Sequence, residues 1–355
     1  MKNFDGRVYS ISDIVEWNSN GLLQLSPDFQ RRAVWTEKAK SYLIDTILRG
    51  KPIPKVLITQ DLQSGRTVRV VVDGQQRLRA ILDYVEGAFK ISRAHNREYA
   101  GMTFGRLPQK VQEGFLSYEL GVDILFEMSY EELLDVFQRL NSYTVKLNKQ
   151  ELLNATYSGY FKQAAYGCGL RYVRYFVDSG ILTKSSVTRM AEADLAADLL
   201  VSIVDGVQSN KGVERYYRDY EDDEGSLPGA VEKFDEIMSF VGVIYSADHI
   251  QSTNWSRSHL FYTLFNVVAH ALYGVKGLNS ENRFKLNKSN LSKVRLALDD
   301  FSVKYDAVAE IINEPKAPKE FKQFIEKSRR GTTDTGARVF RANFASRFVR
   351  DRLAK

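Results

Sequence analysis

Two spacings of apolar residues alternate along the first part of the chain. Residues 36–48 carry apolar side chains every three or four positions and are followed by Gly50, which predicts an amphipathic helix that ends there. Residues 52–59 and 67–72 are short apolar runs separated by a Ser-Gly turn, which predicts two strands. The helical spacing returns immediately after the second run. We therefore expect a strand, a tight turn and a helix that begins at Gln75.

Helical spacing dominates the rest of the chain. Residues 123–127 are a further short strand candidate, residues 130–140 a helix, and residues 141–148 a polar loop. Further helices are predicted at residues 150–165, 191–204, 231–244, 259–272, 288–310 and 319–327, with no later strand. The sequence therefore predicts an α+β fold, in which residues 1–150 form a small mixed domain and residues 151–355 a mainly α-helical domain.

A glycine joins the second predicted strand to the helix that follows it. In the run Val-Asp-Gly-Gln-Gln-Arg, Gly74 lets backbone amides approach an anion closely, and the helix start adds N–H groups and partial positive charge. Arg77 can donate twice to a phosphate, while Asp73 can hold a metal ion, a ribose hydroxyl or a water. The amides of Gln75 and Gln76 suit a base or a phosphate oxygen. The alternative is an ordinary Asp-Gly turn in which Arg77 pairs with Asp73.

Two other polar clusters contain arginine. Arg31 lies between Phe29 and Trp35, where its guanidinium group can reach an anion while the aromatic side chains anchor the loop. A surface loop pinned by these aromatic residues is the alternative. Arg139 and Asn141 lie in a polar turn after the predicted helix at 130–140, and C-capping of that helix by Asn141 is the alternative there.

The basic residues are concentrated near the C-terminus. The chain carries a net charge of +6, but residues 315–355 contain twelve Lys or Arg against four Asp or Glu, so the preceding residues sum to −2. Such asymmetry indicates contact with a polyanion such as DNA, because phosphate neutralisation supplies much of nucleic-acid affinity. A solvated helix face, docked on its own protein through phenylalanines spaced four apart, is the alternative. The candidate contacts to nucleic acid are Arg338, Arg341, Arg347 and Arg350.

Composition limits the class of protein. With 44% hydrophobic and 26% charged residues, the chain has the balance of a folded soluble protein. Its one cysteine, Cys168, cannot form an internal disulfide, and its first residues lack the apolar stretch of a secretory signal. No run approaches the roughly 18 apolar residues that would span a bilayer. We therefore expect a cytoplasmic protein without membrane insertion.

Several motifs in a fixed order resemble one known family. They are Phe29-Gln-Arg with Val34-Trp, Leu48-Arg-Gly-Lys-Pro-Ile-Pro, Val72-Asp-Gly-Gln-Gln-Arg-Leu, Phe137-Gln-Arg-Leu-Asn-Ser and Leu147-Asn-Lys-Gln-Glu-Leu. Together they resemble the N-terminal domain of GmrSD-type restriction endonucleases, most clearly over residues 10–155. The helical remainder agrees more loosely.

The resemblance implies a fold and a chemistry. Members of this family are similar in their core to ParB and sulfiredoxin folds, whose nucleotide-binding loop occupies the position of residues 73–77. Similar proteins bind or hydrolyse nucleoside triphosphates and restrict modified or phage DNA. The resemblance therefore implies a nucleoside triphosphate, with Mg²⁺, at Asp73, Gly74, Gln75, Gln76 and Arg77. It also implies Arg31, Arg139 and Asn141 as helpers, and Asp73 and Arg77 as the catalytic residues of a possible NTPase.

Many relatives carry an HNH-type nuclease domain after the helical region, and none is recognisable in this sequence. Such a site needs a histidine base close to metal ligands. The four histidines are dispersed, and His259 and His270 lie on an otherwise apolar helix, where a core or interface role is expected. Zinc-binding patterns and Walker-type phosphate loops are also missing from the sequence.

Three functions remain open at this point. The first is a nucleotide-dependent switch or NTPase of a restriction or phage-defence system that controls a partner nuclease. The second is a DNA-binding or DNA-nicking module that docks through residues 316–352. The third is a catalytically silent assembly protein, and a homo-oligomer is compatible with each of them. The salt dependence of DNA affinity separates the second from the first.

Overall fold

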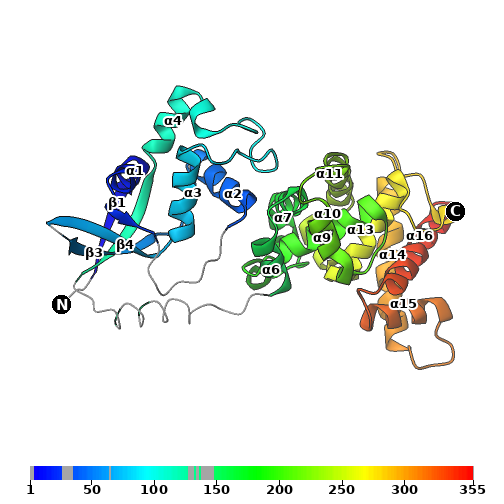
Figure 1. Cartoon of the computed structure of the whole chain (residues 1–355). Coiled ribbons are helices and arrows are strands. Elements are labelled where there is room, and N and C mark those ends of the chain that lie inside the picture. Colours follow the sequence, from blue (N-terminus) through cyan, green and yellow to red (C-terminus); the bar gives the residue numbers. More distant parts are fainter. Residues whose placement is uncertain are drawn as a thin grey trace. The chain divides into compact units, whose positions relative to one another are not determined.

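The computed structural model describes residues 4–25, 35–63, 65–126, 132, 136 and 148–354. The chain divides into two compact units, residues 1–146 and 147–355, each of which is described by itself. In Figure 1 the first unit runs from blue to cyan and the second from green to red. Strands are confined to the first unit among the described residues.

The first unit combines a sheet with helices. Its strands are β1 (Phe4–Ser10), β2 (Leu23–Gln24), β3 (Val56–Gln63), β4 (Arg66–Asp73) and β5 (Glu119–Leu125). Its helices are α1 (Ile11–Ser19), α2 (Glu37–Leu48), α3 (Gln75–Val85) and α4 (Gln109–Leu116). The predicted α+β class is thereby confirmed.

The five strands form one mixed sheet in the order β1-β5-β3-β4-β2. β1 pairs antiparallel with β5, and β3 pairs antiparallel with β4 as a hairpin. β3 runs parallel to β5, and β2 runs parallel to β4. This order places β4, which leads into the candidate site, between the hairpin partner β3 and the short β2.

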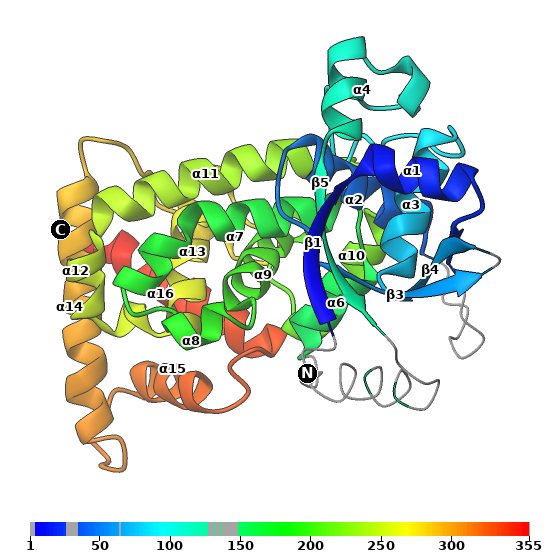
Figure 2. The same ribbon diagram turned by 90° about the vertical axis from the view of Figure 1, so that its left-hand side faces the viewer.

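The core of the first unit lies between the sheet and α1, α2 and α3, which gather on one side of it (Figure 2). Leu120, Val122 and Ile124 alternate with more exposed residues along β5, as expected for a strand with one buried face. Ile44 of α2 and Ile81 of α3 are fully buried against this face. The helices are thus fixed to the sheet through their apolar sides, which leaves their polar sides to line surface hollows.

The second unit contains helices alone among residues 148–354. They are α6 (Lys149–Thr156), α7 (Tyr160–Asp178), α8 (Lys184–Val187), α9 (Ala191–Asp205), α10 (Val213–Asp219), α11 (Leu227–Ile244), α12 (Ala247–Gln251), α13 (Ser258–Tyr273), α14 (Leu291–Glu310), α15 (Lys319–Arg329) and α16 (Thr335–Leu353). α13 lies at the centre of the unit, with most of its length buried, and contacts α9, α11 and α16.

Most predicted elements are present with shifted ends. The helix predicted at 36–48 is α2, begun by the Thr36 side chain, which accepts the N–H of Ala39. The helix predicted from Gln75 is α3. The strand predicted at 123–127 is β5, which begins four positions earlier, at Glu119. The helix predicted at 130–140 lies almost entirely outside the described residues.

Several features differ from the prediction, and the short helices α4, α8, α10 and α12 were not predicted. The helix predicted at 150–165 is two helices, α6 and α7, because the Glu221 carboxylate accepts the N–H groups of Ser158 and Gly159 at 3.1 and 2.8 Å and starts α7 there. β1, α1 and β2 were not predicted, since β1 is largely exposed and β2 is two residues long. Among the described residues, none of the helices is both long and apolar enough for a membrane span.

Candidate functional site

Gly74 forms the turn between β4 and α3. It adopts the left-handed conformation, with φ 93° and ψ 9°, which side chains with a Cβ rarely adopt. A Cβ at this position would lie 3.0 Å from Cγ2 of Val56 and 3.0 Å from Nη2 of Arg77. Both the backbone angle and the surrounding space therefore require glycine here, as the sequence motif predicts.

Arg77 reaches back over this turn. Its Nη2 donates to a carboxylate oxygen of Asp73 at 2.7 Å and to the carbonyl oxygen of Lys55 at 3.1 Å. The Arg77 side chain is 16% exposed, whereas that of Asp73 is 54% exposed. Arg77 thus ties α3 to the last residue of β4 and to the residue before β3. The pair with Asp73 is the one that the sequence left open as the alternative to phosphate contact.

The N-terminus of α3 carries no side-chain cap. Gln75 is buried and donates through Nε2 to the carbonyl oxygen of Val71 at 3.2 Å, which fixes the entry into the helix. The first N–H groups of a helix have no partner within it and carry partial positive charge. An uncapped helix start beside a glycine turn is a geometry that suits an anion.

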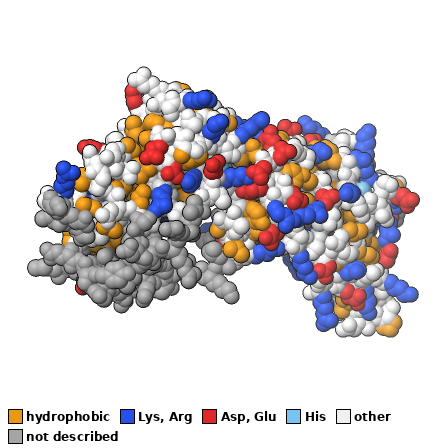
Figure 3. All heavy atoms as spheres, viewed as in Figure 1, with side chains coloured by type: hydrophobic (Ala, Val, Ile, Leu, Met, Phe, Trp, Pro, Cys, Tyr) orange, Lys and Arg blue, Asp and Glu red, His pale blue; other side chains and the backbone are white. Residues whose placement is uncertain are grey.

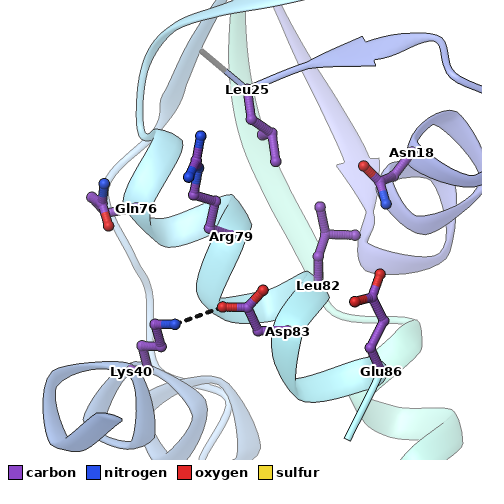
Figure 4. A pocket seen from close by; sticks show the side chains of 8 residues that line it. All are labelled: Asn18, Leu25, Lys40, Gln76, Arg79, Leu82, Asp83 and Glu86. Atoms are coloured by element: carbon purple, nitrogen blue, oxygen red, sulfur yellow. Dashed lines mark hydrogen bonds and ion pairs between the residues drawn. The ribbon is translucent and has the colours of Figure 1, made fainter. Parts of the chain in front are cut away.

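A cavity of about 290 Å³ runs along one side of α3, lined from Gln76 in its first turn to Glu86 just after its last (Figure 4). Gln76, Arg79 and Asp83 reach it from α3, and Lys40 reaches it from α2. Lys40 donates to Asp83 at 2.6 Å, and the Arg79 side chain extends away from this pair (Figure 4). The cavity is close to the lower size of pockets that hold small ligands.

Sequence reasoning singled out Arg77 and missed Arg79 and Lys40. Residues two apart on a helix point to different sides, so Arg77 faces β3 while Arg79 faces the cavity. The sequence did contain a signal for Arg79. Arginines two positions apart on a helix lie on opposite sides of it, so Arg79 could be expected on the side of α3 away from Arg77. Lys40 had no local signal, because only the packing of α2 beside α3 brings it to the cavity.

Asp73 is the candidate metal ligand of the sequence motif. Among the described residues, no group of three or more His, Cys, Asp or Glu side chains is placed to hold a metal ion. Magnesium commonly binds through one or two carboxylates, with substrate phosphates and waters completing its shell. Asp73 is one exposed carboxylate beside the start of α3, paired with Arg77.

Three predicted helper residues, Arg31, Arg139 and Asn141, lie outside the described residues. The nearest described neighbour of Arg31 in this motif is Trp35, whose backbone N–H donates to Oε1 of Gln76 at 3.2 Å. Gln76 therefore contacts the end of that segment and also lines the cavity.

A comparison with models of protein families identifies the domain that contains this site. The model of the GmrSD restriction endonuclease, N-terminal domain, matches residues 11–158. Residues 11–158 form a GmrSD N-terminal domain. The match contains α1, the β4–Gly74–α3 turn and α6, so the candidate site lies inside it. None of the curated proteins matches the chain. The chain therefore carries a domain of restriction endonuclease systems, as the ordered motifs predicted.

Beyond the GmrSD N-terminal domain, the arginines predicted to contact nucleic acid lie on α16. Arg338 is 4% exposed and donates to both carboxylate oxygens of Asp198, at 2.8 and 2.5 Å, and to the Gln208 carbonyl. Arg341 is fully buried and donates to the carbonyl oxygens of Lys327 and Thr332, both at 2.7 Å. These two guanidinium groups face the protein interior, so they present no surface to a phosphate backbone.

The other two predicted contacts lie at the surface of the helical unit. Arg347 donates to Glu320 at 2.6 Å, and Arg350 donates to Asp351 at 2.6 Å. On the face shown in Figure 3, acidic and basic side chains are interspersed over this unit rather than gathered into one basic patch. The four arginines predicted to contact nucleic acid are thus engaged with carboxylates or backbone carbonyls of the helical unit.

The histidines of α13 occupy the positions that its apolar pattern predicted. His270 is 2% exposed; its Nδ1 accepts the N–H of Val275 at 3.0 Å, and its Nε2 lies 3.1 Å from the Asn279 carbonyl. His259 is partly buried, and burial, then the charges of Arg341 and Arg257, lower its pKa to about 4. Both rings pack within the helical unit.

Proposed function

We propose that the GmrSD N-terminal domain of this chain binds a nucleoside triphosphate at the start of α3, as the regulatory component of a DNA restriction or phage-defence system. The observation that carries the proposal is the left-handed Gly74 turn, which leads from β4 into an uncapped helix beside a cavity. Phosphate oxygens would accept from the first N–H groups of α3. The rest of the nucleotide would occupy the adjoining cavity.

The polar side chains of the cavity support a nucleotide over a simple inorganic anion. Gln76 offers an amide, while Arg79 and Lys40 bring two cations to a cavity that also holds the carboxylates of Asp83 and Glu86. An amide can donate to and accept from a base or a sugar, whereas the cations favour phosphate. Arg77 acts on the ligand indirectly in this proposal, since it holds the turn in shape through Asp73 and Lys55.

Hydrolysis is the second part of the proposal. Cleavage of a phosphoanhydride needs an oriented water and, in most cases, a divalent ion that offsets phosphate charge. Asp73 is the exposed carboxylate nearest to the helix start, so it would hold the magnesium ion that accompanies the nucleotide. Hydrolysis of the nucleotide, or its occupancy of the site, would then control a partner nuclease.

The test is binding of fluorescent ATP, GTP and CTP, with magnesium, to the purified chain and to two glycine variants. Gly74→Ala forces a Cβ into a left-handed position with contacts at 3.0 Å, and we expect at least a tenfold loss of affinity, about 1.4 kcal/mol. Gly87→Ala is the matched control, because Gly87 has φ +81° at the other end of α3 and open space around it. It should keep wild-type affinity.

Asp73→Asn separates binding from hydrolysis. We expect the variant to retain nucleotide affinity within a few fold while phosphate release falls to background. Phosphate release at the wild-type rate would exclude Asp73 as the metal ligand. No nucleotide binding by the wild type, or equal losses in the Gly74 and Gly87 variants, would contradict the proposed site.

A further inference from the structure

A second hollow in the first unit lies at the C-terminal end of α2. It has a volume of about 520 Å³ and is formed by Leu48 at the end of α2, by Arg49, which follows it, and by residues 93–99 of the connection after α3. Arg49, Arg93 and Arg97 are all exposed at its surface. We call this hollow the arginine pocket. It is separate from the cavity beside the α3 N-terminus, with which it shares no lining residue.

Buried hydrogen bonds hold the pocket in shape. His95 is 7% exposed, and its Nδ1 lies 2.9 Å from the hydroxyl of Ser41 on α2, which also accepts the N–H of Ser92 at 2.8 Å. Asn96 is 6% exposed and donates to Asp45 at 2.8 Å. The connection is therefore fastened to α2 by polar groups that are themselves removed from water.

Arg49 belongs to the same network. Its Nε donates to Asp45 at 2.7 Å, and its Nη2 donates to the carbonyl oxygen of His95 at 3.1 Å. The side chain nevertheless remains 50% exposed. Its orientation is thus set by the protein while one edge of the guanidinium group faces the pocket. Such pre-orientation lowers the entropy cost of binding a ligand.

Charge identifies the class of ligand. Among the described residues that line the pocket, three are arginines and one, Glu98, is acidic. Glu98 is engaged by the hydroxyl of Tyr99, a hydrogen bond that raises the pKa of Tyr99. The planar guanidinium fork matches the geometry of phosphate oxygens, and it is less strongly hydrated than a lysine ammonium group. The surface therefore suits a phosphate-bearing polyanion.

We propose that the arginine pocket is a docking site for the phosphodiester backbone of DNA, with Arg93 and Arg97 as the main contacts and Arg49 as a third. The choice of DNA as the polyanion rests on the proposed role in restriction. Phosphate contacts of this kind position a protein on the duplex and do not read its sequence. The pocket lies in the GmrSD N-terminal domain, far along the sequence from the C-terminal segment to which the charge count pointed.

The test is fluorescence anisotropy of a short labelled DNA duplex, titrated with the full chain over a series of salt concentrations. The variant is Arg93→Ala/Arg97→Ala, which leaves the buried network and Arg49 in place. We expect the Kd to rise by about tenfold, and the slope of log affinity against log salt to fall by about 2, one for each lost phosphate contact. Circular dichroism and thermal unfolding check that the variant keeps its fold.

A matched control removes the same charge from the same unit. Arg66 and Arg106 are exposed and lie outside the pocket, so Arg66→Ala/Arg106→Ala should change the Kd by less than about threefold and leave the slope nearly unchanged. Equal losses in both double variants would overturn the proposal, because they would show a diffuse effect of net charge. An unchanged slope in the Arg93/Arg97 variant, or a wild type that does not bind DNA, would also overturn it.

Nucleotide binding by the same variants separates this proposal from the previous one. Loss of DNA affinity with nucleotide affinity retained supports the arginine pocket as an independent site. If the wild type binds DNA through these arginines but binds no nucleotide, the proposed nucleotide site fails and the pocket stands. Loss of DNA binding in Arg347→Ala/Arg350→Ala, with the pocket variant unaffected, would place the contact on α16 and overturn the pocket.

Discussion

Arginines of the two units differ in burial. On α16, Arg338 and Arg341 are 4% and 0% exposed. Arg338 donates to the carboxylate of Asp198, and Arg341 donates to backbone carbonyl oxygens. In the arginine pocket, Arg93 and Arg97 are exposed, and the buried polar groups lie beneath them. The difference shows that local charge density does not reveal what a guanidinium group contacts. Burial decides whether a guanidinium group is accessible to a ligand.

The buried pair on α16 is part of the core of the helical unit. Arg338 makes a two-pronged contact with Asp198 of α9, and its guanidinium carbon lies 4.0 Å from the centre of the Tyr262 ring on α13. Asp198 is 7% exposed. A charge at such a site is tolerated because its partner is present, and removal of one partner leaves the other buried and uncompensated.

The largest predicted effect therefore comes from Arg338→Met. It should lower the free energy of unfolding of the helical unit by about 3–5 kcal/mol, because Asp198 is left as an unpaired buried charge. Urea denaturation followed by fluorescence of Trp255, which is 1% exposed in the same unit, measures the change. Arg174 is the control, because it pairs with Asp178 at the surface and its side chain is 92% exposed. Arg174→Met should lower the free energy of unfolding by less than about 1 kcal/mol.

A double variant tests the cause. Asp198→Leu/Arg338→Met removes both charges and replaces them with apolar side chains, so much of the lost stability should return. If the double variant were as unstable as Arg338→Met, the loss would come from packing of the Arg338 stem rather than from the unpaired carboxylate. The contrast with the exposed arginines would then rest on shape instead of charge.

An intermediate effect is expected from pH. The pKa of His259 is lowered from 6.5 to about 4 by burial, then by Arg341 and Arg257. As pH falls below 6.5, His259 becomes protonated in the unfolded chain but stays neutral in the folded unit. The free energy of unfolding is therefore highest above pH 6.5 and decreases until about pH 4, where the folded unit also binds the proton. The slope from this residue should stay below about 1.4 kcal/mol per pH unit, since partial exposure screens the group.

The measurement compares urea unfolding of the wild type with that of His259→Gln between pH 4 and pH 7. Glutamine cannot be protonated in this range, so the variant should show the flatter dependence. His270 also has a lowered pKa, caused mainly by burial, but it is common to both proteins and cancels from the difference. Parallel curves would mean that the His259 ring is solvated in the native state and that Arg341 does not repel its proton.

Local sequence signals predicted much of the fold. Spacing of apolar residues located α2, α3, α9 and α13 because their buried faces follow the helical period. The division of the region after residue 148 into α6 and α7 was not predictable in this way. It depends on Glu221, which lies about sixty positions along the chain and is brought to Gly159 by tertiary packing.

The site divides in the same manner. The strand–glycine–helix motif was evident because Gly74 and the change of period lie next to each other in the sequence. Lys40 and the arginine pocket were missed because they arise from side-by-side packing of α2 with α3 and with the connection that follows α3. The burial of Arg338 and Arg341 on α16 was missed for the converse reason, since charge in a sequence carries no information on burial.

The smallest effect is expected for Arg347→Ala. Arg347 and Glu320 pair at 2.6 Å, but their side chains are 38% and 60% exposed, so loss of the pair should cost no more than about 1 kcal/mol. Because this guanidinium group is already engaged with Glu320, the salt slope of DNA affinity should stay at the wild-type value. A slope lower by about 1 would show that Arg347 leaves Glu320 to contact phosphate. In that case α16 would hold both kinds of arginine, and the contrast would lie between the buried and exposed faces of one helix rather than between two units.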